Sequence, residues 1–206
     1  LLAIIFCKKF KMINKSYFLH GGILGLFLFL AYLVQTVGCN FTTAGKNAFL
    51  TTIYVILIPL ISWPLYRKRP KWYVFIAGII CLTGIGFLAL AGENLSLTNI
   101  NIGDVITLIC GFFYAIHIIY VEKWNQEEDP ILLTVLQFAY AAIFAWILAP
   151  FVKDSNLNGP FPLNELKNSK VIFSMLYLGI FSTMIAFFLQ NLCLKYVPSA
   201  LASLFL

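Results

Sequence analysis

Charged residues are scarce in this sequence: they make up 11% of the chain, against about a quarter of an ordinary soluble domain. Hydrophobic residues make up 61%, which is more than a soluble protein carries without exposing large apolar patches that aggregate. The shortage of charge therefore excludes a soluble domain and indicates a protein that is dissolved in lipid. The net charge of +6 does not indicate nucleic-acid binding, because most Lys and Arg residues lie in short runs between apolar segments, as in cytoplasmic loops of membrane proteins.

Acidic residues are rarer still, and none lies in the middle of an apolar segment; they are Glu93, Asp104, Glu122, Glu127, Glu128, Asp129, Asp154 and Glu165. A proton antiporter built on a central buried glutamate would need such a carboxylate, which these segments do not contain, unless it lies on the missing helix 1, 2 or 10. An intramembrane hydrolase would need a nucleophile beside a base, or a HExxH-type metal site, and neither occurs. The 5 cysteines are scattered without a CxxC pair and are interpreted as small packing residues. We therefore predict that the protein is not an enzyme and has no catalytic residue, cofactor or metal.

Long apolar runs are what the sequence does contain, at about residues 17–38, 44–66, 72–91, 103–122, 131–151 and 171–192. Each is about 20 residues long or slightly more, and at 1.5 Å per residue such a helix crosses a hydrocarbon core of roughly 30 Å. Strands are excluded, because transmembrane strands are about half that length and alternate in polarity. The sequence therefore predicts an all-α integral membrane protein with six complete transmembrane helices. Two partial helices, at about 1–7 and from about 197 onward, lead us to expect a fragment truncated at both ends.

The distribution of cations over alternate loops predicts how the helices are oriented. One set of loops holds the clusters at 8–15 and 67–71 together with Lys123 and Lys195, whereas the other set holds only Lys46, Lys153, Lys167 and Lys170. Because cytoplasmic loops carry the excess of Lys and Arg, we expect the first set to be inside. The turn that follows Cys39 would then lie outside, and the turn at 194–198 would lie inside.

The sequence around Gln35 recurs near the C-terminus. Without a gap, Ala31, Gln35 and Phe41 align with Ala186, Gln190 and Tyr196, and Thr43-Ala44-Gly45 aligns with Pro198-Ser199-Ala200. The offset of about 155 residues indicates two copies of one membrane unit. Because one turn is predicted outside and its copy inside, the two units would be threaded in opposite directions. Such inverted repeats are typical of transporters whose site lies near the membrane midplane.

Three stretches carry a resemblance to a known family: LFLAYLVQTVGCNFTTAGKNAFLTTIYVILIPL, NIGDVITLICGFFYAIHIIYVEKW and LYLGIFSTMIAFFLQNLCLKYVPSALASLFL. In order and spacing they closely resemble the EamA-type transporters of the drug/metabolite transporter superfamily, and the resemblance covers almost the whole chain. It implies a ten-helix fold of two inverted five-helix repeats. Residues 1–91 would be the first repeat, without helix 1 and most of helix 2. Residues 102–206 would be the second, truncated in helix 9 and without helix 10.

The resemblance also implies a secondary transporter that moves a small metabolite, amino-acid-like or another small organic solute, by alternating access. The alternative is a non-transporting scaffold or assembly subunit of the same architecture. A wet, polar-lined cavity between the repeats favours the transporter, whereas a tightly packed apolar centre favours the scaffold. The expected partners are membrane lipid and a small-molecule substrate, with no nucleic acid, and the expected location is the bacterial cytoplasmic membrane. Fold-level resemblance does not identify the cargo.

Polar stripes on apolar helices are expected to face the bundle interior or a wet cavity. Helical spacing groups such residues on common faces; Asn47, Thr51 and Tyr54, for example, lie at i, i+4 and i+7. The candidate cavity-lining residues chosen in this way are Tyr32, Gln35, Asn47, Thr51, Tyr54, Tyr114, His117, Phe187, Gln190 and Asn191. For each of them the alternative is a hydrogen bond to a neighbouring helix, which membrane interfaces commonly use.

Three residues have two interpretations each, and a fourth is expected to cap a helix. Pro59 removes a backbone donor and obstructs the carbonyl of Val55, which predicts a kink that is either a hinge or a static bend. His117, inside a span, is either a functional group or a neutral histidine bonded to a neighbouring helix. Lys46 either snorkels to the outer headgroups or contacts substrate. Asp104 is expected to cap the N-terminus of its helix.

Overall fold

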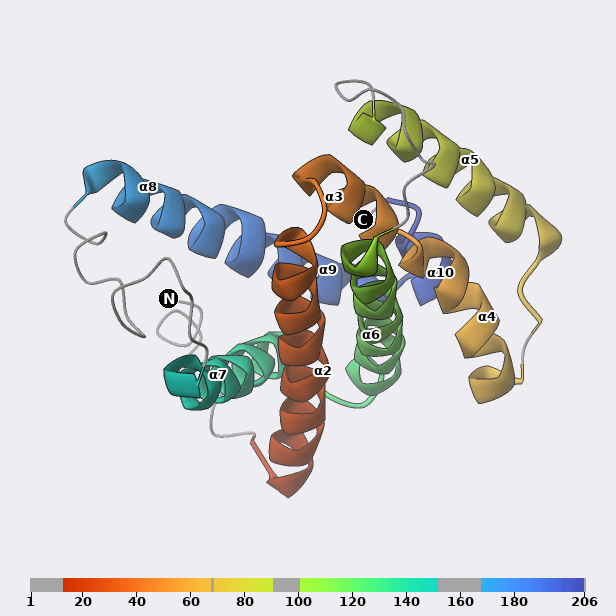
Figure 1. Cartoon of the computed structure of the whole chain (residues 1–206). Helices are drawn as coiled ribbons and strands as arrows, with labels where there is room; N and C mark the ends of the chain where they lie inside the picture. The colour runs from red at the N-terminus through yellow and green to blue at the C-terminus, as the bar shows by residue number, and fades with distance from the viewer. Residues whose placement is uncertain (1–12, 68, 91–100, 152–167, 206) are drawn as a thin grey trace.

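The structure, a computed structural model, describes residues 13–67, 69–90, 101–151 and 168–205, and all regular secondary structure within these ranges is helical (Figure 1). The α-helices are α2 (Lys15–Cys39), α3 (Ala44–Thr51), α4 (Tyr54–Tyr66), α5 (Trp72–Leu90), α6 (Ile102–Asn125), α7 (Pro130–Leu148), α8 (Ser169–Tyr177), α9 (Ala186–Leu194) and α10 (Ser199–Ala202). A short 3-10 turn, η2 (Ala149–Phe151), follows α7, and a π-helical stretch, η4 (Leu178–Ile185), joins α8 to α9.

Within the described ranges, 5 segments are long and apolar enough to cross a membrane: Lys15–Cys39, Ala44–Tyr66, Ile102–Asn125, Pro130–Phe151 and Ser169–Leu194. They coincide with five of the six predicted spans, so the prediction of an all-helical membrane protein is confirmed. The remaining span, predicted at about 72–91, forms the apolar helix α5. Of the two predicted partial helices, the one at 1–7 lies outside the described residues, and the other begins as α10.

Polar residues begin most of the helices. The side chains of Asn14, Thr43 and Asn168 accept hydrogen bonds from backbone N–H groups in the first turns of α2, α3 and α8. Asn101 and Asp104 form a complete capping box at the start of α6, which confirms the predicted cap. Such caps satisfy N–H groups that have no partner within the helix and that lipid cannot satisfy.

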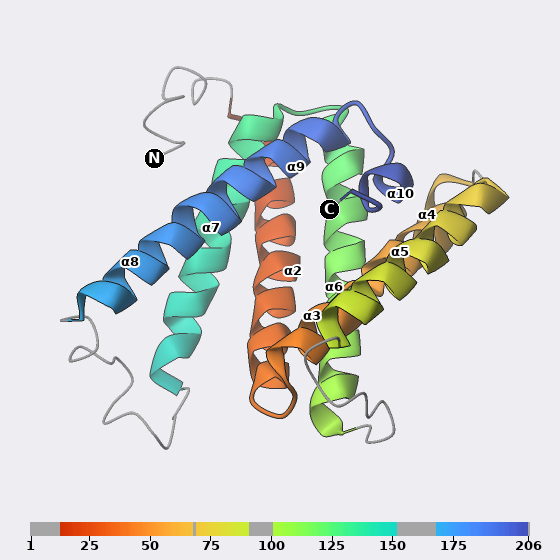
Figure 2. The ribbon, with the colours of Figure 1, turned by 90° about the horizontal axis from the view of Figure 1, so that it is seen from above.

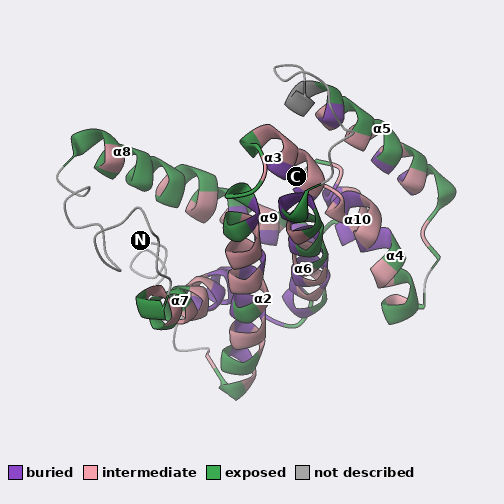
Figure 3. Cartoon of the chain, viewed as in Figure 1, coloured by how far each residue is buried: buried purple, intermediate pink, exposed green. Residues whose placement is uncertain are grey.

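The core of the bundle is formed where α2 packs along both α6 and α7. Small residues on α2 permit this close approach: a Cβ added to Gly25 would lie 2.6 Å from Tyr140 Cβ and 2.8 Å from the backbone oxygen of Gln137. Close helix contact through small residues is a common way of packing in membranes. Figure 3 shows that buried residues concentrate on α2, α6 and α7, whereas α5 and α8 at the two sides are largely exposed.

The second span is interrupted at Thr52 and Ile53, several residues before the proline at which a kink is predicted. Ile53 N donates to Leu50 O at 3.3 Å, and Val55 N donates to Thr52 O at 3.0 Å, so these bonds reach back three residues and not four. At the interruption α6 approaches closely, because a Cβ on Gly111 would lie 2.5 Å from Ile53 Cγ2. Beyond it, α4 continues through Pro59, which is buried. A hinge role for Pro59 remains a prediction.

The connections between helices gather at two opposite ends of the bundle. Figure 2 shows the start of α2, the α6–α7 connection and the α9–α10 connection at one end, and the α2–α3 turn with the start of α6 at the other. Hydrogen bonds join the connections at each end: Glu122 Oε2 accepts from Ser199 N at 3.1 Å, and Asp104 Oδ1 accepts from Thr42 Oγ1 at 2.8 Å. The alternation agrees with the loop sets used to predict orientation, and the assignment of one end to the cytoplasm remains a prediction.

Candidate functional site

A cavity of about 240 Å³ opens where α2, α3, α4, α6 and α9 meet. It is lined by Gln35, Thr51, Tyr54, Tyr114, Ile118, Ala186, Phe187 and Gln190. Two amides and three hydroxyls thus face a space whose other walls are apolar. None of these lining residues carries a charge, so the cavity offers hydrogen bonds without an ionic partner.

Gln35 is held in place by its neighbours on two other helices. Its Oε1 accepts a hydrogen bond from the Tyr114 hydroxyl at 3.2 Å, and its Nε2 donates to Thr51 Oγ1 at 3.4 Å. Thr51 in turn donates to Asn47 O at 2.8 Å. In contrast, no residue in the described ranges bonds to the amide of Gln190, which is half-buried. One amide is therefore fixed by the protein, whereas the other is available to a ligand.

Aromatic rings form one wall of the cavity. Tyr32 contacts Tyr114 edge to face, with ring centroids 5.9 Å apart, and its ring lies 6.2 Å from that of Phe187. Tyr54 and Tyr114 are 6.3 Å apart, and Phe138 packs on Phe187 at 5.7 Å. Rings at these separations prefer tilted and edge-to-face arrangements, and three of them, Tyr54, Tyr114 and Phe187, line the cavity.

Six of the ten predicted residues line the cavity. The other four do not line it and instead make ring contacts or lie in contacts between helices. Tyr32 lies behind the lining residues and reaches them through its ring contacts. Asn47 donates to Gln35 O and to Thr107 Oγ1 at 2.9 Å, which ties α3 to α2 and α6. His117 and Asn191 are each fully buried in contacts between helices. Substrate binding by any of the ten remains a prediction.

His117 and Asn191 follow the interpretation in which a polar residue bonds to a neighbouring helix. His117 Nε2 lies 2.9 Å from Gln137 Oε1 on α7. The amide of Asn191 donates to Thr134 Oγ1 at 2.7 Å, and its backbone oxygen accepts from Asn125 Nδ2 at 2.8 Å. These bonds join α6, α7 and α9 and satisfy some of the polar groups that lipid could not. Gln137 Nε2 and Asn191 Oδ1 are buried without a hydrogen-bond partner among the described residues.

Sequence reasoning missed two kinds of residue at this site. Ile118 and Ala186 line the cavity but are apolar, so no polar stripe marks them. The position of Ile118, four residues after Tyr114, and the alignment of Ala186 with Ala31 were the available signals. Gln137, a lone amide in an apolar run, could have been flagged as the partner of a buried polar group.

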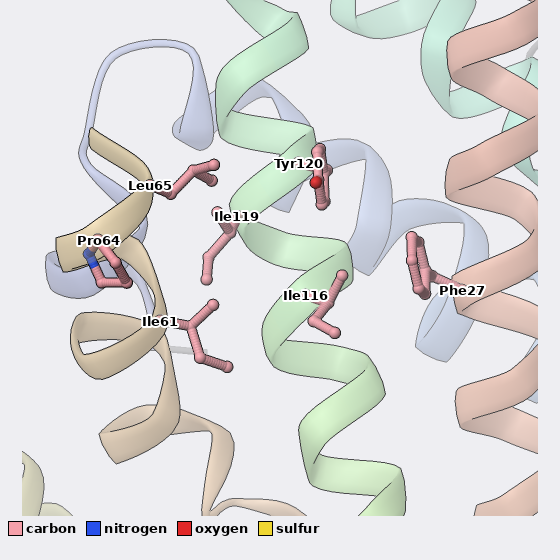
Figure 4. Close-up of a pocket in the computed structure, with 7 residues that line it drawn as sticks. All are labelled: Phe27, Ile61, Pro64, Leu65, Ile116, Ile119 and Tyr120. Carbon is pink, nitrogen blue, oxygen red and sulfur yellow. The ribbon is translucent and has the colours of Figure 1, made fainter. Parts of the chain in front are cut away.

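Two other hollows differ from this cavity in character. Figure 4 shows a hollow of about 470 Å³ lined by Phe27, Ile61, Pro64, Leu65, Ile116, Ile119 and Tyr120, in which the Tyr120 hydroxyl is the only polar side-chain group among the lining residues. A larger one, about 840 Å³, lies at the end of the bundle that holds the α9–α10 connection, and both acidic and basic side chains line it. Among the described residues, no group of three or more His, Cys, Asp or Glu side chains could hold a metal.

Apolar helices of membrane-crossing length, packed around a cavity whose wall carries several polar groups, define a multi-pass integral membrane protein. Residues 1–90 and 101–206 match the EamA-like transporter family, and the chain belongs to that family. The resemblance stated from the sequence is thereby confirmed. The family is one of transporters and not of enzymes.

Two relatives are named uncharacterized transporters, and both are from the archaeon Archaeoglobus fulgidus. One is 33% identical over 207 residues, which cover 98% of this chain and 61% of the relative. The other is 27% identical over 195 residues, which cover 91% of this chain and 63% of the relative. The chain therefore spans less than two thirds of the length of these curated relatives. No solved structure matches the chain.

Proposed function

We propose that this chain is the larger part of a secondary transporter that moves a small metabolite across the cytoplasmic membrane by alternating access. The observation that carries the proposal is the cavity itself, because Gln35 and Gln190, at equivalent positions of the repeat, both line it. A site built jointly by two oppositely threaded units can open to either face when one unit moves against the other. The cargo class is a small, polar or amphipathic solute, amino-acid-like or of similar size.

The proposal includes a ten-helix fold made of two inverted repeats, with residues 1–91 in the first and 102–206 in the second. Contacts between equivalent positions support it. Tyr32 and Phe187 are related by the same offset as Gln35 and Gln190, and their rings are 6.2 Å apart. Residues close to a two-fold axis contact their own counterparts, so this pair is what a pseudo-two-fold axis in the membrane plane would produce.

A non-transporting scaffold of the same architecture is the competing proposal. A scaffold needs no polar groups in its centre, and an amide there without a hydrogen bond would only destabilise it. Gln190 is such a group among the described residues. Its position in the cavity wall therefore supports transport over scaffolding. Because the relatives are archaeal, they give no support to the prediction that the membrane is bacterial.

Uptake by reconstituted vesicles tests the proposal. The intact protein is placed in lipid vesicles and supplied with a panel of radiolabelled metabolites that includes neutral, acidic and basic amino acids. We expect saturable uptake of at least one of them, reduced about tenfold or more by Gln35→Ala or Gln190→Ala, since each substitution removes hydrogen bonds worth about 1–1.5 kcal/mol or more. Gln126→Ala is the matched control, because Gln126 is exposed at the end of α6.

Two outcomes contradict the proposal in different ways. If no metabolite of the panel enters vesicles above the level of empty ones, the scaffold is favoured. If uptake occurs but Gln35→Ala and Gln190→Ala behave like Gln126→Ala, the protein transports by another path. In that case both cavity amides serve only in packing.

A further inference from the structure

A cluster of polar side chains lies at one end of the bundle, far from the cavity. It joins the first turns of α2 to the connection between α6 and α7, which Figure 1 shows at the same end. Ser16 Oγ donates to Glu128 Oε1 at 2.7 Å, and His20 Nδ1 lies 2.9 Å from the same oxygen. The His20 ring stacks on Trp124 of α6, with centroids 4.3 Å apart and planes inclined by 11°.

The cluster is buried although it contains an acid. Glu128 is only 8% exposed, and its second oxygen, Oε2, is buried without a hydrogen-bond partner among the described residues. The side chain of His20 is 17% exposed. If Glu128 is ionised and His20 neutral, the pair carries a net charge of −1 and one carboxylate oxygen is unsatisfied. Burying such a charge is costly unless it is neutralised.

We propose that His20 and Glu128 form a proton-binding site that controls how α2 docks on the α6–α7 connection. With the imidazole N–H on Nδ1 donated to Glu128 Oε1, the incoming proton adds to Nε2 and the net charge of the pair changes from −1 to 0. The proton strengthens the hydrogen bond between α2 and the connection, because it becomes a bond between two ions. Loss of the proton leaves the buried charge uncompensated and weakens the docking.

The other ionisable groups near this site are already engaged or lie outward. On α2, the Tyr17 hydroxyl accepts from the backbone N–H of Asp129 at 2.9 Å. Asp129 itself caps α7 by accepting a hydrogen bond from Ile131 N at 2.9 Å.

The remaining ionisable side chains near the site are exposed to the surroundings; they are Glu127, Lys15 and Lys123. The Lys123 ammonium lies over the ring of Tyr120. At this end of α2, His20 and Glu128 are therefore the pair whose protonation would change a buried charge.

The site is placed where it can influence the rest of the bundle. α2 is a single uninterrupted helix from Lys15 to Cys39, and it carries Gln35 to the cavity. Fifteen residues separate His20 from Gln35, which corresponds to about 22 Å along the helix axis. A change in docking at the first turn of α2 is transmitted along a rigid element to the cavity wall. The proton site does not depend on the proposed function, because docking of α2 can respond to protons whether or not a solute is transported.

Tryptophan fluorescence tests the proposal without any substrate. An imidazolium stacked on an indole quenches its emission more strongly than a neutral imidazole does. Trp63, Trp72 and Trp146 are replaced by Phe so that Trp124 reports alone, and the chain is titrated in micelles from about pH 8 to about pH 5, where histidines change charge. We expect one transition in which emission falls as the pH is lowered, and we expect His20→Gln to abolish it.

The role of the acid is tested by a matched pair of variants. Glu128→Gln keeps the shape of the side chain and removes its charge, so the imidazolium loses its partner and the emission curve should depart from that of the parent protein. Glu127→Gln removes the same charge from the adjacent, exposed residue and should leave the curve unchanged. If the emission of the parent protein does not change with pH, the proposal is overturned, and this result does not depend on whether Glu128→Gln folds. The proposal is also overturned if the emission curve of Glu128→Gln coincides with that of Glu127→Gln.

Discussion

Replacing Gly25 by alanine tests whether the close contact between α2 and α7 holds the bundle together. The added Cβ would lie 2.6 Å from Tyr140 Cβ, 2.8 Å from Gln137 O and 3.2 Å from Ala141 N. Carbon atoms in favourable contact are about 3.5–4.0 Å apart, so the two helices must separate by about 1 Å. Two of the three neighbours are backbone atoms, which cannot rotate away. Overpacking of this kind costs about 1–3 kcal/mol.

The same substitution has an opposing, favourable effect, because alanine is a better helix former than glycine by about 0.5–1 kcal/mol. The net prediction for Gly25→Ala is therefore a loss of about 0.5–2 kcal/mol in the free energy of unfolding, measured by titrating the purified protein in micelles with a denaturing detergent. Gly84→Ala is the control: the described structure has no atom within 4 Å of a Cβ at Gly84 on α5. It should be neutral or slightly stabilising. Equal effects of the two substitutions would refute the tight α2–α7 packing.

Two further predictions concern the ends of the bundle. Asp104→Asn breaks the ion pair between Asp104 and Lys46, whose side chains are 4% and 14% exposed, and should cost up to about 3–5 kcal/mol in the same unfolding assay. Adding Lys46→Met should recover part of that loss, and strictly additive effects would contradict an interacting pair. For topology, Arg69→Cys and Asn94→Cys, made in a chain without its native cysteines, should react with an impermeant maleimide from opposite sides of the membrane. Reaction of both from one side would overturn the predicted orientation.

Features governed by local chemistry were predictable from the sequence. Membrane-crossing length and apolar composition are properties of a single segment, so the helices at 17–38 and 103–122 were predicted with ends close to those of α2 and α6. The cap at Asp104 was predictable for the same reason, because a carboxylate in the first turn interacts with N–H groups of its own helix. The predicted internal repeat aligns Gln35 with Gln190, and both line the cavity.

Features that depend on neighbouring helices were not predictable in this way. His117 and Tyr114 share one polar face of α6, yet Tyr114 lines the cavity and His117 bonds to Gln137 of α7. Helical periodicity assigns a face but does not say which neighbour covers it. The interruption at Thr52 likewise lies where α6 approaches at Gly111, and no proline marks it in the sequence.

Hydrogen bonds at its two ends connect α6 to both units of the predicted repeat. Near its start, Asp104 accepts a hydrogen bond from Thr42, in the turn that follows α2. Near its other end, Glu122 accepts from the backbone N–H of Ser199, in the turn that follows α9. The two turns correspond in the predicted repeat, since Thr43-Ala44-Gly45 aligns with Pro198-Ser199-Ala200. The two carboxylate-bearing residues are eighteen positions apart, about 27 Å along the axis. Because both acids belong to one rigid helix, a displacement of either turn acts on the element to which the other turn is also bonded.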